Sequence, residues 1–200
     1  MNKKEKAVKA LKLLFIGEFI VAIGLLGELY VVYEPLAMIA FVSIIGTIIA
    51  LIGIAKLGRV NKFFLTACII IGLSLLFGIT TGALTTFGLA PNVVEVMKDA
   101  SNIIGKIFSF VFIFCVIRGC SKAATGSARS KIATIMTIVN IVGKGIAITF
   151  SILQSIFDSK NPTFAGACSI VSMAASMFVQ IYFVYYIFIA YKKAKSLVNA

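Results

Sequence analysis

Four ionisable side chains stand inside long apolar runs of this 200-residue sequence: Glu18, Glu28, Lys106 and Lys144. Charged groups are costly in hydrocarbon, and where they occur they often serve a solute pathway or pair with one another. Counted at 1.5 Å per residue from the basic residue at the cytoplasmic boundary of each segment, Lys144 lies about 20 Å deep, Lys106 about 18 Å, Glu28 about 24 Å and Glu18 only about 9 Å. Matched depth therefore predicts that Glu28, and not Glu18, is the partner of Lys144, while Lys106 pairs with Glu28 or extends to the outer surface.

Lys144 also belongs to a polar stripe within the apolar run 132–157. At about 100° per residue, one helix face would carry Thr134, Thr137, Asn140, Lys144, Ser151 and Ser155. Two interpretations remain open. The stripe lines a polar pathway or an anion-binding point, or Lys144 forms a buried pair with Glu28 while the hydroxyls bond back to their own helix.

The composition indicates that the elements carrying these residues cross a membrane. The chain is 60% hydrophobic and 13% charged, whereas about a quarter of the residues of soluble domains are charged. A bilayer-spanning helix needs roughly 20 apolar residues. Six segments qualify, at 13–33, 36–55, 63–89, 102–117, 132–157 and 164–191, and the fourth is expected to gain turns from 92–101. Because lipid offers no partner for backbone polar groups, we predict an all-α bundle of six transmembrane helices in one domain, residues 1–200, arranged as three hairpins.

The distribution of basic residues predicts the orientation of this bundle. Most Lys and Arg residues lie at the N-terminus, at the C-terminus or in the connections around residues 56–62 and 118–131. The other basic residues are Lys106 and Lys144 inside the apolar runs, and Lys98 and Lys160. Cytoplasmic segments of membrane proteins are enriched in Lys and Arg. Both termini are therefore predicted to be cytoplasmic, in a cell membrane and most simply a bacterial inner membrane.

Small residues predict where the helices touch, because bilayer helices pack by close backbone approach. Gly24 in the first segment and Gly78 and Gly82 in the third are expected to lie at helix interfaces. In the sixth segment, Ser172 and Ser176 are expected to do the same.

Several kinds of chemistry find no support in the sequence. The chain has no histidine, and its four cysteines are scattered without a C-x-x-C pair, so we expect no metal site, no cofactor and no enzymatic activity. The formal net charge of +12 is spread over four short segments and does not form one patch. Membrane topology explains this charge, and we expect no binding to nucleic acid.

One stretch carries a resemblance. Gly53-Ile54-Ala55-Lys56-Leu57-Gly58-Arg59, followed by Asn61, Phe63 and Ala67, resembles small uncharacterised multi-pass membrane proteins of Gram-positive bacteria. The likeness covers about fifteen residues and implies a membrane location without implying an activity.

Two functions remain open on the sequence alone. The first is a structural or accessory membrane component that packs through its Gly and Ser faces against copies of itself or other membrane subunits. The second is a channel or transporter subunit for a small solute or ion, which would use the stripe on the fifth segment. In both cases the lipid bilayer is the surrounding partner.

Overall fold

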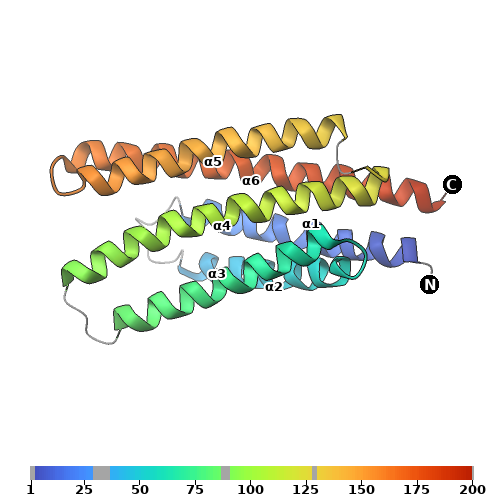
Figure 1. The fold of residues 1–200 in the computed structure, drawn as a ribbon, viewed down its shortest axis with the longest axis horizontal. Coiled ribbons are helices and arrows are strands. Elements are labelled where there is room, and N and C mark those ends of the chain that lie inside the picture. Colours follow the sequence, from blue (N-terminus) through green and yellow to red (C-terminus); the bar gives the residue numbers. More distant parts are fainter. Residues whose placement is uncertain (1–2, 29–36, 87–90, 128–129, 200) are drawn as a thin grey trace.

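The computed structural model describes residues 3–28, 37–86, 91–127 and 130–199, and within these ranges the regular structure is entirely helical (Figure 1). The helices are α1 (Lys3–Glu28), α2 (Ala37–Gly58), α3 (Lys62–Thr86), α4 (Pro91–Thr125), α5 (Lys131–Phe157) and α6 (Pro162–Asn199). Each overlaps one of the six predicted segments, but α1 begins ten residues before its predicted segment, and α4 and α6 each end eight residues after theirs. As expected, the fourth helix is longer than its apolar run and begins at Pro91.

The lengths and compositions of these helices are consistent with a membrane protein. In the described part of the chain, α3, α4, α5 and α6 are long and apolar enough to cross a bilayer, and α2 contributes a shorter apolar helix, Val42–Gly58. The most extensive helix contacts join α1 to α2, α5 to α6 and α3 to α4, which are consecutive pairs along the chain. The two ends of the chain lie at the same end of the bundle (Figure 1).

Short polar side chains begin three of the helices. Asn61, Ser130 and Asn161 each accept a hydrogen bond from a backbone N–H of the following first turn, at 3.2, 3.3 and 3.1 Å. Such caps satisfy donors that have no partner inside the helix. Pro91 and Pro162 occupy first helical positions, where the missing N–H costs nothing.

The apolar core lies at the end of the bundle that holds the termini. Its largest fully buried side chains come from five helices: Leu11, Leu14, Ile54, Leu57, Phe64, Ile117, Phe183 and Ile187. The buried Tyr186 hydroxyl also donates a 3.0 Å hydrogen bond to the backbone carbonyl of Ile117, which ties α6 to α4.

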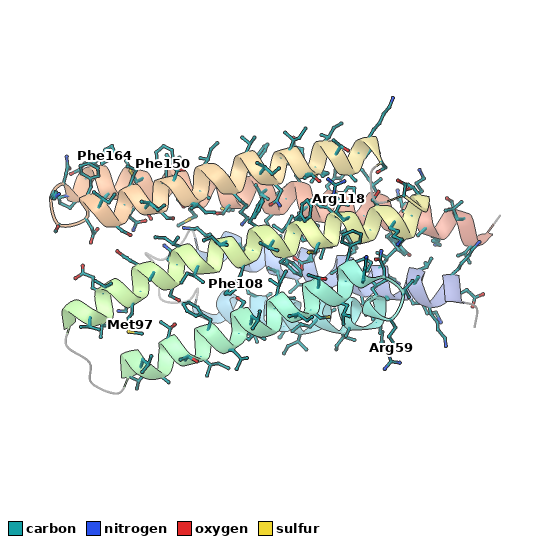
Figure 2. The ribbon with its side chains drawn as sticks, viewed as in Figure 1. Arg59, Met97, Phe108, Arg118, Phe150 and Phe164 are labelled. Atoms are coloured by element: carbon teal, nitrogen blue, oxygen red, sulfur yellow. The ribbon has the colours of Figure 1, made fainter. Side chains whose placement is uncertain are left out.

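The opposite end of the bundle is more open. Beyond Ile70 no described residue of α3 is buried, and before Ile113 the same holds for the described residues of α4. Figure 1 shows this pair diverging from α5 and α6, which stay packed. Figure 2 places Arg59 near the termini and Met97 at the opposite, distal end.

Glycines of α1 and α2 let these helices approach closely. A Cβ built on Gly17 would lie 2.7 Å from the carbonyl oxygen of Gly46, and one on Gly24 would collide with the Ser43 side chain. Gly24 therefore lies at a helix interface, as predicted. Gly78 and Gly82 do not have that role inside this chain, because a Cβ at either would meet no atom within 4 Å. They belong to the half of α3 beyond Ile70, in which no described residue is buried.

Candidate functional site

The polar stripe of α5 is mostly on its inward face. Thr137, Asn140, Lys144 and Ser151 are buried, whereas Thr134 is exposed near the start of the helix. Thr137 donates to the carbonyl of Ala133 in its own helix, at 2.7 Å. The other buried members of the stripe face neighbouring helices or open space, so the stripe is only partly satisfied by its own backbone.

All six helices contribute to a central cavity of about 350 Å³. Its charged lining residues are Glu18 of α1 and Lys144 of α5, each 5% exposed, and its further polar lining residues are Thr47, Ser74, Ser109, Ser176 and Gln180. No carboxylate of the described residues forms an ion pair with the Lys144 ammonium. An acid and a base therefore line the same cavity without an ion pair between them.

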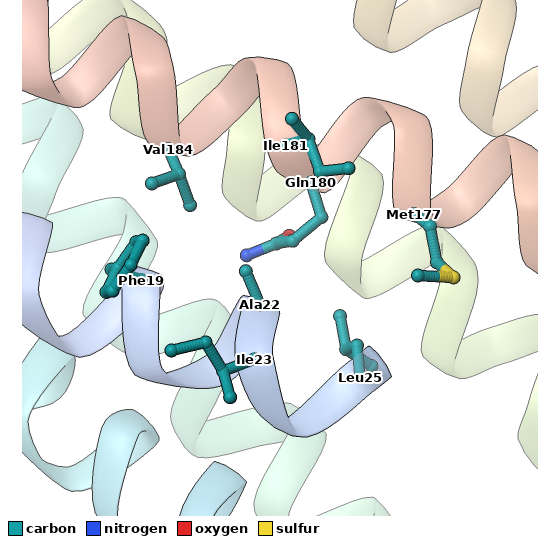
Figure 3. A pocket seen from close by; sticks show the side chains of 8 residues that line it. All are labelled: Phe19, Ala22, Ile23, Leu25, Met177, Gln180, Ile181 and Val184. Atoms are coloured by element: carbon teal, nitrogen blue, oxygen red, sulfur yellow. The ribbon is translucent and has the colours of Figure 1, made fainter. Parts of the chain in front are cut away.

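Glu18 is held by one neighbour from the far end of the chain. The Gln180 side-chain amide donates a 2.9 Å hydrogen bond to Oε2 of Glu18. Figure 3 shows Gln180 extending from α6 toward α1, close to Ala22. It also borders an apolar pocket of about 170 Å³ between these two helices, lined by Phe19 and Met177 among others.

A second set of polar contacts starts at Lys106 on α4. Its ammonium donates to the Ser151 hydroxyl of α5, which is 2.9 Å from the Ser172 hydroxyl of α6. Ser172 also lies 2.8 Å from the carbonyl oxygen of Ala147 and donates to it. These contacts connect three helices, and Ser172 therefore has the interhelical role predicted for it.

Lys106 also lines a second space, the distal cavity, of about 320 Å³. The distal cavity is bordered by Asn102, Gln154 and Ser169 and shares Leu25 and Ser176 with the central cavity. The Ser176 hydroxyl is buried and has no hydrogen-bond partner among the described residues. The two cavities therefore share part of their walls, at the place where the Ser176 hydroxyl has no hydrogen-bond partner among the described residues.

Asn140 lies on the stripe one turn before Lys144 and is not among the residues that line either cavity. Its Nδ2 donates a 3.0 Å hydrogen bond to the backbone carbonyl of Phe110, while its buried Oδ1 has no partner in the described part of the chain. The amide links α5 to α4 next to Lys144. It is a structural contact, with one acceptor left unused.

The predicted pair of Glu28 and Lys144 stays a prediction, because the Glu28 side chain lies outside the described residues. The structure does bring Glu18, which depth counting set aside, to the same cavity as Lys144. Lys106 contacts Ser151, a partner that depth counting did not suggest. Gln180 could be recognised in the sequence only as part of a small and polar face of the sixth segment.

Metal chemistry finds no support in the described residues, which contain no group of three or more His, Cys, Asp or Glu side chains able to hold an ion. Comparison of the chain with family models, curated proteins and solved structures gives no match. The function is therefore argued from the geometry of the two cavities.

Proposed function

We propose that this protein is a multi-pass cell-membrane protein that binds a small polar solute inside its helical bundle and lets it cross the membrane. In this proposal the helices form three antiparallel hairpins with both termini in the cytoplasm, in agreement with the basic residues of the terminal and cytoplasmic segments. The sequence ranks an accessory role first. The polar interior of the bundle is the reason to prefer permeation.

The observation that carries the proposal is the central cavity with Glu18 and Lys144 in its wall. Burying an unpaired charge costs several kcal/mol, and apolar side chains of similar size are commonly as stable or more stable in such positions. A purely structural bundle would have no need of these groups. A cavity of about 350 Å³ is also within the size range of small-molecule sites.

The adjoining distal cavity supports a path and not merely a closed site. It begins at the half-buried Lys106 and the exposed Asn102, and it meets the central cavity at Leu25 and Ser176. Polar donors are present along both spaces. A solute entering at the distal end would meet hydrogen-bonding groups as far as Glu18.

Uptake into proteoliposomes tests the proposal. The radiolabelled solutes are glycerol, acetate, methylamine and L-alanine, which cover the neutral, anionic, cationic and zwitterionic classes. We expect wild-type protein to accelerate the entry of at least one solute over protein-free liposomes. The double variant Asn140→Leu/Lys144→Met should lose this activity, while Lys98→Met, a lysine change at an exposed site, should retain it. Wild-type uptake equal to that of empty liposomes would reject permeation.

The accessory role is the second candidate. The half of α3 beyond Ile70, in which no described residue is buried, favours it. Gly78 and Gly82 expose backbone to the surroundings, where another helix could approach closely. Native mass spectrometry of protein released from its host membrane in mild detergent tests this. Co-purifying subunits or a stable homo-oligomer that Gly78→Leu disrupts would support the accessory role, and a monomer unaffected by that change would count against it.

A further inference from the structure

The charges around the central cavity point to a class of solute, and this inference rests on the proposed function. We propose that the central cavity binds a small zwitterion, such as an amino acid, with its carboxylate toward Lys144 and its ammonium toward Glu18. The two groups line the same cavity, carry opposite charge and are both 5% exposed. Each still has bonding capacity, as the contacts at the two ends of the cavity show.

At the basic end, two donors, Lys144 and Ser176, have no acceptor among the described residues. The Lys144 ammonium has no ion pair in the described part of the chain, and the Ser176 hydroxyl in the same wall is buried without a hydrogen-bond partner. Lys106, which lines the adjoining distal cavity, contacts Ser151, one turn beyond Ala147 and two turns beyond Lys144 along α5. A carboxylate is the group that best fits such donors, because it accepts from several of them at once.

The acidic end has an acceptor with room for a donor. The hydrogen bond from Gln180 reaches only Oε2 of Glu18, and no other hydrogen bond to this carboxylate comes from the described residues. The nearby Thr47 hydroxyl is occupied, since it donates to the carbonyl of Ser43 at 2.8 Å. An ammonium group in the cavity would give Glu18 a charged donor that the described residues do not supply.

A zwitterion suits this cavity better than a simple ion does. An anion that reached Lys144 would share the cavity with the Glu18 carboxylate, and a cation that reached Glu18 would be repelled by Lys144 and, beyond it, Lys106. A molecule carrying both charges meets an opposite charge at each end. Desolvating its two charged groups costs energy, and the opposite protein charge that each group meets offsets that cost.

Isothermal titration calorimetry on the full-length protein in nanodiscs tests the inference with three matched ligands. Propionate is L-alanine without its ammonium group, and ethylamine is L-alanine without its carboxylate. We expect L-alanine to bind at least about tenfold more tightly than either, because each truncated ligand leaves a buried protein charge without its partner.

Two variants test which charged group of the ligand lies at each end of the cavity. Glu18→Gln should remove the preference for L-alanine over propionate, and Lys144→Met should remove the preference for L-alanine over ethylamine. Glu95→Gln and Lys98→Met make the same chemical changes at exposed positions and should leave all three affinities unchanged. The comparison of ligands on wild-type protein tests the class even if a variant fails to fold.

The outcomes separate the solute class from the proposed function. If propionate or ethylamine binds as tightly as L-alanine, or if none of the three ligands binds, the proposal of a zwitterionic solute is wrong. In either case the uptake of another solute into proteoliposomes would leave permeation intact. If the protein binds none of the ligands and also transports none of the tested solutes, both the proposed solute class and the proposed permeation function are wrong.

Discussion

The Gln180 amide donates a 2.9 Å hydrogen bond to the Glu18 carboxylate and so joins the first helix to the last inside the bundle. Both side chains are buried, and both line the central cavity that also contains Lys144. The contact holds the carboxylate against α6 while leaving it on the cavity wall. Glu18 and Gln180 are therefore expected to stabilise the fold through their hydrogen bond, while the Glu18 carboxylate is also expected to bind the solute.

Removing the Gln180 amide should destabilise the protein through Glu18. We expect Gln180→Leu to lower the free energy of unfolding by about 1–3 kcal/mol, because it leaves a buried carboxylate without its hydrogen-bond donor. Thermal unfolding of the purified protein in detergent measures the loss. In a double-mutant cycle with Glu18→Leu the two losses should be strongly non-additive. Additive losses would mean that the bond contributes little.

The Tyr186 hydroxyl should contribute to the apolar core. Tyr186→Phe removes its hydrogen bond to the Ile117 carbonyl, and we expect a loss of about 1 kcal/mol in unfolding free energy. Tyr182→Phe is the matched control one turn earlier on α6, where the side chain is 42% exposed. The control should change stability by less than about 0.5 kcal/mol. Equal effects of the two variants would show that the buried bond has no particular role.

Glycines of α1 and α3 should respond in opposite ways to an added methyl group. Gly17→Ala places a Cβ against the backbone of α2 and should cost about 1–3 kcal/mol, since neither helix can yield locally. Gly78→Ala meets no atom within 4 Å and should be neutral or stabilising by up to about 1 kcal/mol, because alanine favours helix. Thermal unfolding of both variants decides this. A large loss at Gly78 would instead indicate that a partner covers α3.

The predicted pairing of Glu28 with Lys144 has its own test. If the two are coupled, the stability changes of Glu28→Gln and Lys144→Met should differ from additivity by about 0.5–3 kcal/mol in a double-mutant cycle. Unfolding in detergent gives all four free energies. Additive changes would contradict the pair and leave Lys144 with no protein counter-ion, as in the described part of the structure.

Most of the architecture could be predicted from the order of residues. The existence and approximate place of each helix follow from apolar runs long enough for a bilayer, and the early start of α4 follows from the absence of a breaker after Pro91. The polar extensions at the start of α1 and at the ends of α4 and α6, beyond these runs, were not predicted. The inward face of α5 could also be predicted, because Asn140 and Lys144 recur at helical spacing. These features depend on local sequence, which is why counting along the chain recovers them.

Only the tertiary structure decided which of these residues meet. Counting residues measures depth along one helix, but tilt and rotation determine which side chains share a space, and they bring Glu18 and Gln180 to the cavity of Lys144. The same limit explains Gly24 and Gly78, which look alike in the sequence. Gly24 is covered by α2, whereas the half of α3 that carries Gly78 diverges together with α4 from α5 and α6, and a Cβ at Gly78 would meet no atom within 4 Å. Apolar length and helical spacing are properties of a segment, while a cavity belongs to the way six segments pack.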